Sequence, residues 1–254
     1  MNSARSCFHS GNPIITLKHA LNCPRTVSVT FSIAEKHNLS KTSPPEHSLF
    51  WRLWHQNKHY AKKALATTFI QDMVKGTLNP ISYTRYNVSD AYFCYSGADD
   101  YKTAMNKAQD AVLKAYLSAK YRSYKRYNEM FPRTMCLKDA SGIEPNAVCK
   151  EYSDFERSVV RDEEAVYTIF AMLPCEFLWP WLGSQIEYPD VTNVYREWIM
   201  MNLKVEQGNA FAAGNFLVDF ESVYGREIDH DKAGRIYRQA MVYEWQNFAT
   251  ACSY

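Results

Sequence analysis

Apolar residues recur at every third or fourth position along most of the chain after residue 49. The first run comprises Phe50, Leu53, Trp54, Ala61, Ala64, Leu65, Thr68 and Phe69, and it stops at Gly76. This spacing places the residues on one face of a helix, so it predicts one long amphipathic helix over 50–76. Asn79 and Pro80 then supply a helix cap followed by proline at the first helical position, which predicts a second helix.

Similar helical patterns run over about 100–130, 153–187, 190–223 and 230–251. The stretch 132–146 bears Gly, Pro and Ser and is interpreted as the main internal loop. Sustained alternation of period two, bounded by hairpin turns, is absent from the sequence. We therefore predict an all-α fold without internal repeats.

Residues 1–46 differ from the rest because they are rich in Ser, Thr, Asn and Pro and hold two acidic residues. This composition predicts an irregular N-terminal arm over 1–46, followed by one helical domain over 47–254. Because the arm is poor in acids, an organelle-targeting role is an alternative, but the arm lacks the arginine-rich amphipathic pattern of such segments.

Composition narrows the range of partners. Apolar residues make up 46% of the chain, enough for a sizeable core, and 29 basic against 27 acidic residues give a net charge of +2. This balance argues against nucleic acid or an anionic membrane as a partner. A membrane span and a secretory leader are not expected from the sequence, so we predict a soluble cytoplasmic protein. Seven cysteines without CxxC pairs are interpreted as reduced thiols.

Two carboxylates stand where helical spacing places apolar residues. Asp90 follows Tyr86 by four positions and precedes Phe93 by three, so it projects from an aromatic helix face, where its carboxylate is desolvated. The alternative for Asp90 is an ordinary structural hydrogen bond or salt bridge. Glu244 lies four residues before Phe248 on a similar face, and burial there raises a glutamate pKa and makes it a proton donor near neutral pH.

Cys175 is the third polar residue in an apolar setting. Pro174 precedes it inside a helical stretch and removes the hydrogen bond to the Phe170 carbonyl, so we expect the helix to bend next to the thiol. Trp179, one turn further on, is suited to form a wall for a flat ligand. Taken alone, the cysteine is better explained as a small buried structural thiol than as a reactive one.

Four separated motifs carry a family resemblance. Residues 173–179 read Leu-Pro-Cys-Glu-Phe-Leu-Trp, 195–199 read Tyr-Arg-Glu-Trp-Ile, and 243–248 read Tyr-Glu-Trp-Gln-Asn-Phe. Upstream, Gly-Thr-Leu at 76–78 is followed by Tyr-Asn-Val-Ser-Asp-Ala-Tyr-Phe at 86–93. In this order, over about residues 48–251, the motifs resemble the TenA/thiaminase II family. The resemblance implies a haem-oxygenase-like helical bundle of about seven or eight helices.

The resemblance also implies roles for single residues. Cys175 would add to the pyrimidine ring of thiamin or a related aminopyrimidine, Glu244 would protonate the ring nitrogen, and Asp90 would hold the amino-group edge. The remaining residues implied to bind substrate are Phe93 and Trp179, which would sandwich the ring, together with Tyr86, Tyr152 and Asn202. For Tyr152, a surface tyrosine at a helix start is the alternative.

The sequence departs from the family pattern at Ser89, where the family has glutamine, at Asn202, where it has tyrosine, and at Glu176, where an aromatic is common. The activity implied is cleavage at the methylene bridge of the aminopyrimidine, with water as acceptor and no cofactor. Base exchange to another nucleophile, or a catalytically silent aminopyrimidine-binding protein, are the alternatives. The family also implies a homo-oligomer, either a tetramer or a dimer.

Metal-dependent chemistry on this fold requires histidines on several core helices. Six of the seven histidines lie at or before His59. His55 and His59 have the spacing of two ligands on one helix, but they stand beside Lys58, Lys62 and Lys63 and are interpreted as a solvated face. We therefore predict no metal site.

Overall fold

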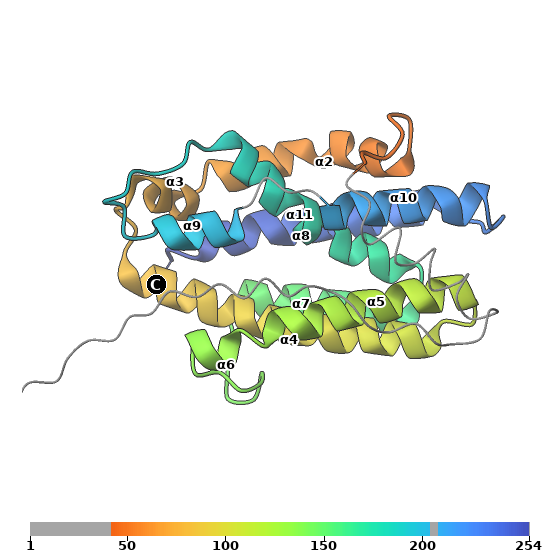
Figure 1. Cartoon of the computed structure of the whole chain (residues 1–254), viewed down its shortest axis with the longest axis horizontal. Coiled ribbons are helices and arrows are strands. Elements are labelled where there is room, and N and C mark those ends of the chain that lie inside the picture. The colour runs from red at the N-terminus through yellow and green to blue at the C-terminus, as the bar shows by residue number, and fades with distance from the viewer. Residues whose placement is uncertain (1–41, 204–207, 254) are drawn as a thin grey trace, which may run out of the picture.

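The computed structural model describes residues 42–203 and 208–253, and within these residues the secondary structure is entirely helical (Figure 1). The helices are α2 (Leu49–Leu65), α3 (Thr68–Lys75), α4 (Pro80–Lys107), α5 (Ala111–Asn128), α6 (Phe131–Thr134), α7 (Ala147–Asp162), α8 (Tyr167–Gln185), α9 (Arg196–Asn202), α10 (Gly208–Ser222) and α11 (His230–Thr250). Seven of them have 15 residues or more. The predicted all-α bundle is confirmed.

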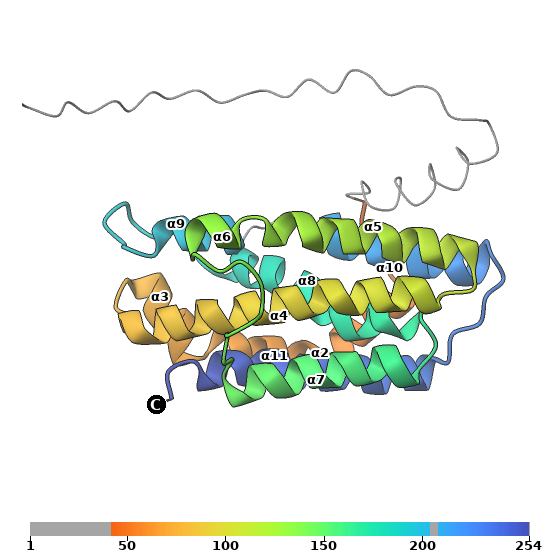
Figure 2. The ribbon, with the colours of Figure 1, turned by 90° about the horizontal axis from the view of Figure 1, so that it is seen from below.

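The long helices run along the long axis of the molecule (Figures 1 and 2). Helix α4 packs between α5 and α7, while α11 packs against α2, α7 and α8. Helix α8 touches α2, α4, α7, α10 and α11, so it lies in the middle of the bundle. Such a position requires a helix that is apolar on every side.

The sequence of α8 meets that requirement, because 14 of its residues are buried. Pro174 and Pro180 both lie inside the helix, and the helix continues through them. The bend that we expect at Pro174 stays a prediction. Because α8 is central, it places Cys175 and Glu176 in the interior of the bundle, where neighbouring helices pack against several sides of α8.

The prediction of one long helix over 50–76 is wrong. Helix α2 ends at Leu65, and Thr67 adopts an extended backbone conformation before α3 begins. The Thr67 hydroxyl donates to the Ala64 carbonyl at 2.7 Å and satisfies the end of α2. Apolar spacing does not reveal the break, because Phe69 and Ile70 return to the core directly after it.

The other predicted stretches also merge separate helices. The pattern over 100–130 covers the end of α4 and all of α5, whose first turn is capped by Asp110. The pattern over 153–187 covers most of α7 and α8, and that over 190–223 covers α9 and α10. The cap at Asn79 is confirmed, since its side chain accepts from the Ile81 N–H at 2.8 Å, and α11 agrees with 230–251.

Two of the four motifs hold the fold together near α9. The Tyr195 hydroxyl donates to the Leu78 carbonyl at 2.7 Å, and the Trp198 indole donates to Asn87 Oδ1 at 2.7 Å. Gly76 ends α3 with φ of 76°, a left-handed conformation that glycine adopts without strain. These contacts tie the Gly-Thr-Leu and Tyr-Arg-Glu-Trp-Ile motifs to each other and to α4.

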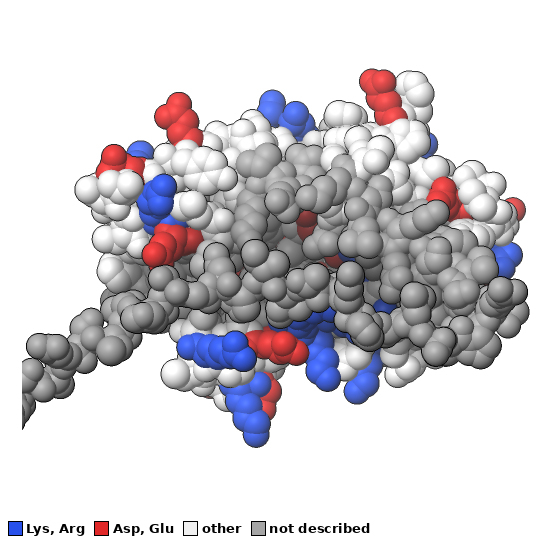
Figure 3. Space-filling view, viewed as in Figure 1, with Lys and Arg blue, Asp and Glu red and all other residues white. Residues whose placement is uncertain are grey.

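Most of the predicted N-terminal arm, residues 1–41, lies outside the described residues. Among the helices that are described, none is long and apolar enough to cross a membrane. On the face seen in Figure 3, Lys and Arg side chains gather along the edge over α5 and α6, with acidic side chains among them.

Candidate active site

A cavity of about 260 Å³ lies between α4, α5, α8, the end of α9 and the start of α10. Five of the residues predicted from the sequence line it: Asp90, Phe93, Cys175, Trp179 and Asn202. The other three, Tyr86, Tyr152 and Glu244, do not line this cavity. Their contacts with each other and with Cys175 place Tyr152 and Glu244 directly behind its wall.

The Cys175 thiol and the Glu244 carboxyl form a pair across α8 and α11. Cys175 hydrogen-bonds to Glu244, an interaction that favours the ionised glutamate. Burial opposes this and raises the pKa of Glu244 to about 8. Burial, followed by the charge of Glu244, also raises the pKa of the Cys175 thiol well above its usual range. Near neutral pH the pair therefore holds protons that can be transferred.

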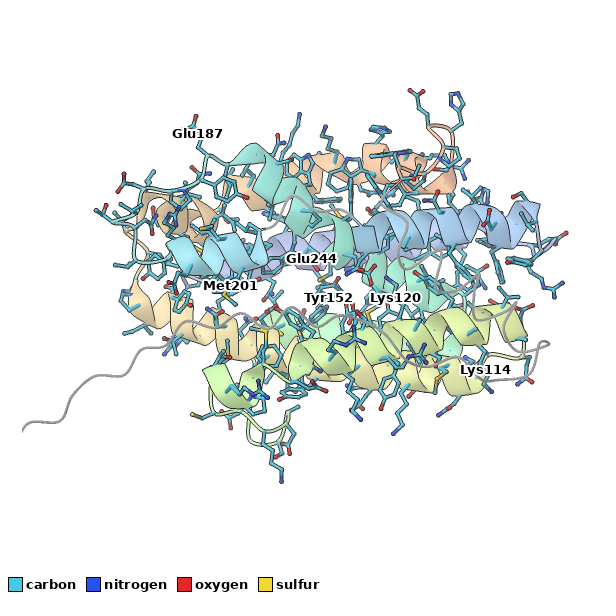
Figure 4. All side chains as sticks on the ribbon, in the orientation of Figure 1. Lys114, Lys120, Tyr152, Glu187, Met201 and Glu244 are labelled. Carbon is cyan, nitrogen blue, oxygen red and sulfur yellow. The ribbon has the colours of Figure 1, made fainter. Side chains whose placement is uncertain are left out.

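Tyr152 lies behind this pair and orients the Glu244 carboxyl through a hydrogen bond. Its hydroxyl donates to Glu244 Oε1 at 3.1 Å, and Figure 4 shows the two side chains together near the centre of the bundle. The ring stands 4.7 Å from that of Phe93 and stacks on Tyr243 at 5.5 Å. Tyr152 is 1% exposed, so the alternative of a surface tyrosine is wrong.

Asp90 projects from α4 into the same cavity. Burial raises its pKa to about 7. No donor within the described residues hydrogen-bonds its carboxyl group, so the alternative of an ordinary structural hydrogen bond or salt bridge finds no partner there. A desolvated carboxyl that faces a cavity without a partner is suited to bind a ligand with hydrogen-bond donors.

Aromatic rings form the rest of the wall near Cys175. Trp179 packs on Trp198 at 5.8 Å and on Phe248 at 5.6 Å, and its buried indole nitrogen has no hydrogen-bond partner within the described residues. Tyr86 stacks on Phe248 at 5.4 Å behind Trp179. Tyr86 therefore supports the wall and does not face the cavity.

The three departures from the family pattern have different surroundings. The Ser89 hydroxyl accepts from the backbone N–H of Asn146 at 3.0 Å and does not line the cavity, so this change lies outside it. Asn202 lines the cavity, where its amide donates to the Trp198 carbonyl at 2.8 Å and accepts from the Tyr127 hydroxyl at 3.4 Å. One of the two hydrogens on the Asn202 side-chain nitrogen is therefore already in a hydrogen bond.

Glu176 carries a buried ion pair that the sequence analysis missed. Its Oε2 lies 2.6 Å from Lys120 Nζ, and its Oε1 accepts from the Tyr101 hydroxyl at 3.1 Å. Both Lys120 and Glu176 line the cavity. Lys120 follows the buried Tyr116 by four positions, so a charge on the apolar face of α5 was the signal that could have revealed it.

His55 and His59, the alternative metal ligands, have aromatic neighbours on α2. The His55 ring stacks on Trp51 at 5.7 Å, and the His59 ring is tilted against Tyr60 at 3.9 Å.

Solved structures share this helical architecture. The chain is similar to the TenA homologue from P. horikoshii OT3, with a TM-score of 0.67 and 19% identity over 80% of this chain and 98% of that one. It is also similar to a putative TenA-like thiaminase from Sulfolobus solfataricus P2, with a TM-score of 0.61 and 15% identity over 79% of this chain and 94% of that one. At these identities the likeness shows the fold.

The model of the TENA/THI-4/PQQC family matches residues 54–254, so the chain belongs to this family. A curated relative, the bifunctional TH2 protein, mitochondrial, of Arabidopsis thaliana, is 22% identical over 271 residues, which cover 94% of this chain and 44% of that protein. The chain thus spans less than half the length of this relative. Family membership supports a function that concerns thiamin-related aminopyrimidines.

Proposed function

We propose that the protein cleaves thiamin or a related aminopyrimidine at its methylene bridge, with water as the acceptor. The observation that carries this proposal is the Cys175 thiol hydrogen-bonded to Glu244 beside a cavity that Asp90 also lines. A nucleophile, a proton carrier and a carboxyl for orientation are the groups that addition to a heteroaromatic ring requires.

Cys175 would add through its sulfur to a ring carbon of the pyrimidine while Glu244 delivers a proton to the ring nitrogen. The thiol proton would replace the one that Glu244 gives up, so charge does not accumulate in the buried site. Addition weakens the bond between the methylene carbon and its leaving group. The thiazole leaves with the electrons of that bond, and a water oxygen bonds to the methylene carbon and releases one proton to solvent. The sulfur then leaves the ring carbon, and the proton on the ring nitrogen returns to the enzyme, so that the thiol is restored.

Asp90 would bind the amino-group edge of the ring. Its pKa of about 7 means that the carboxyl is near half ionised at neutral pH, and either form can hydrogen-bond an aminopyrimidine. Phe93 and Trp179 would hold the flat ring between them, because both line the cavity beside Cys175 and Asp90.

The test is an incubation of the purified protein with thiamin, with and without pyridine or aniline, followed by identification of pyrimidine products by mass spectrometry. We expect the hydroxymethyl product in both cases. Loss of thiamin only with the added nucleophile would contradict hydrolysis and indicate base exchange. No turnover of thiamin or simple aminopyrimidines would indicate a binding protein.

Cys175→Ser is the variant that tests the mechanism, and Cys136→Ser is its matched control. Cys136 is exposed and does not line the cavity. We expect the first variant to lose turnover and keep its helical spectrum, while the control keeps wild-type turnover. Full activity in Cys175→Ser would remove the nucleophile from the proposal.

Two further proposals concern assembly and location. A homo-oligomer, either a tetramer or a dimer, is supported by family membership and by exposed apolar side chains near α9, namely Tyr188, Val191, Val194, Met200 and Met201. Light scattering coupled to size-exclusion chromatography tests it, and a monomeric mass would contradict it. A cytoplasmic location stays a prediction.

A further inference from the structure

Lys120 and Glu176 are charged residues of the cavity lining that the proposed reaction does not yet use. Lys120 reaches from α5 toward α8 and α10 (Figure 4), and its Nζ lies 2.6 Å from Glu176 Oε2 and 3.4 Å from the Asn209 carbonyl oxygen. Both side chains line the cavity although they are only 4% and 8% exposed. Two opposite charges therefore meet in the same space as the Cys175 thiol.

Packing alone does not explain this ion pair. The loss of hydration of two buried charges offsets most of their attraction, and apolar side chains of similar volume are often as stabilising or more so. At position 176 an aromatic residue is common in the family. The ion pair is therefore better explained by the ligand that the cavity holds than by the stability of the fold.

The ion pair also has unused hydrogen-bonding capacity. Among the residues that the structure describes, Lys120 donates to Glu176 and to Asn209. Glu176 accepts one further hydrogen bond there, from the Tyr101 hydroxyl at 3.1 Å. An ammonium group has three hydrogens and a carboxylate has about four acceptor sites, so one donor and about two acceptor sites are left. A ligand group that both accepts and donates a hydrogen bond matches this set.

The ion pair and Asp90 stand at different levels along α4. The hydrogen bond from Tyr101 places Glu176 beside the later turns of this helix. Asp90 precedes Tyr101 by 11 positions in the same continuous helix, which separates their backbones by about 16 Å along the axis. A single aromatic ring that is held at Asp90 therefore leaves the part of the cavity beside Lys120 for the rest of the substrate.

We propose that Lys120 and Glu176 form a second subsite of the cavity, which binds an uncharged hydroxyl group of the substrate and rejects the phosphate ester of that hydroxyl. This inference rests on the proposed function. In thiamin the group is the hydroxyethyl arm of the thiazolium ring, across the methylene bridge from the aminopyrimidine. Its oxygen accepts from the Lys120 ammonium and its hydrogen is donated to the Glu176 carboxylate, so both charged groups gain a partner.

Charge explains the rejection of a phosphate ester. A phosphate monoester carries a charge of about −1.5 to −2 at neutral pH. The charge of Lys120 is already balanced by Glu176, so the phosphate would meet a carboxylate in a buried place where repulsion is weakly screened. Asp90, with a pKa of about 7, adds negative charge to the same cavity. A neutral hydroxyl meets no such repulsion.

Glu176→Gln tests the subsite, because glutamine keeps the size of the side chain and leaves Lys120 as an unbalanced cation. The measurement is kcat/KM for thiamin and for thiamin phosphate. We expect the wild-type protein to prefer thiamin by about tenfold or more, and the variant to lose or reverse this preference. The ratio does not depend on how much of the variant folds. Absence of the preference in the wild type, or the same preference in Glu176→Gln, would overturn the proposal.

Lys120→Met combined with Glu176→Leu separates charge from shape, since both charges are lost at similar volume. The probe is a thiamin analogue with an ethyl group in place of the hydroxyethyl arm. We expect the wild-type protein to use this analogue about tenfold less efficiently than thiamin, and the double variant to use the two alike. This comparison also serves if Glu176→Gln does not fold. Equal use of both compounds by the wild type would contradict the subsite.

Glu163→Gln is the matched control for the loss of a carboxylate from a lysine–glutamate pair. Glu163 lies 2.9 Å from Lys232 Nζ in a partly exposed pair that does not line the cavity. We expect this control to keep the wild-type preference between thiamin and thiamin phosphate. A changed preference in Glu163→Gln would show that the effect of Glu176→Gln is not specific to the cavity.

Calorimetric binding to Cys175→Ser separates failure of the subsite from failure of the proposed function, because it needs no turnover. We expect thiamin to bind more tightly than thiamin phosphate, and the added Glu176→Gln change to remove the difference. If this pattern holds while the wild-type protein cleaves no aminopyrimidine, the proposed function is refuted and the subsite stands. Cleavage of thiamin together with equal binding of the two ligands refutes only the subsite. Absence of thiamin binding refutes both.

Discussion

Lys120 and Glu176 form a salt bridge of 2.6 Å whose side chains are 4% and 8% exposed, one residue away from the thiol of Cys175. The pair joins α5 to α8, and Lys120 also donates to the Asn209 carbonyl of α10 at 3.4 Å. The same two side chains line the cavity. A buried ion pair therefore joins the helix that carries Cys175 to the opposite wall of the cavity.

Removal of one partner of this pair should destabilise the protein strongly. Lys120→Met leaves the Glu176 carboxylate buried without its cation, and we expect a loss of about 3–5 kcal/mol in the free energy of unfolding. Lys120→Met combined with Glu176→Leu should recover most of it. Urea denaturation measures both. The control is Lys150→Met, which breaks the exposed pair with Asp154 and should cost about 1 kcal/mol at most.

Tyr152→Phe should move the pH dependence of the reaction. The Tyr152 hydroxyl lowers the pKa of Glu244, which burial raises to about 8. Loss of this hydrogen bond removes a stabiliser of the ionised form, so the pKa of Glu244 rises further. If protonated Glu244 is the active form, the alkaline limb of the kcat profile shifts to higher pH. A shift to lower pH would contradict the assignment of Glu244 as proton donor.

Asp90→Asn should stabilise the folded protein above neutral pH. The folded-state pKa of Asp90 is about 7 against an ordinary value of 3.8, so the folded state binds more protons between these values. Stability contributed by Asp90 is therefore full below about pH 4 and declines as pH rises to about 7. We expect a higher melting temperature than wild type at pH 8 and a smaller difference at pH 5.

Asp190→Asn provides the control for this pH effect, because its carboxylate is exposed and its pKa is lowered by hydrogen bonds from Thr192. The sign is opposite: the aspartate stabilises the folded state above its unfolded pKa, so the variant should be slightly less stable than wild type at both pH values. Equal behaviour of the two variants would show that Asp90 is not desolvated.

Gly97→Ala should reduce the affinity for substrate. A β-carbon at Gly97 would lie 2.9 Å from Cε1 of Tyr124, too close for the ring to remain where it is. Tyr124 lines the cavity, so its displacement changes the space beside Cys175. We expect KM to rise severalfold and stability to fall by about 1–3 kcal/mol. Gly234→Ala, whose β-carbon would make an ordinary contact of 3.8 Å with Leu53, should leave KM unchanged and should not lower stability, because alanine is favoured over glycine inside a helix.

The sequence predicted the fold class well because apolar spacing reports which residues face a core. It failed at helix ends, where the deciding contacts are local and polar. The hydroxyl of Thr67 and the carboxylate of Asp110 end or begin helices inside apolar patterns that continue on both sides. A periodic pattern does not carry this information, so neighbouring helices were merged.

For the candidate site, a polar residue at an apolar helical position was an informative signal. It led to Asp90, Cys175 and Glu244, and the structure brings all three to one cavity or its wall. The same signal holds for Lys120 and Glu156, each four residues after a buried tyrosine, but no motif drew attention to them. What periodicity could not provide was partnership across helices, such as Tyr152 with Glu244, because these residues are 92 positions apart.

Because α8 is buried on all sides, substitutions on this helix and substitutions on the outer wall of the cavity should have different consequences. Cys175 belongs to this central helix. Any substitution on α8 must fit the packing of several neighbouring helices. Tyr127, Met201 and Asn202 belong to the outer wall, where side chains are partly exposed. Substitution on that wall reshapes the cavity at little cost in stability, so the set of molecules that fit the cavity can change while Cys175 stays in place.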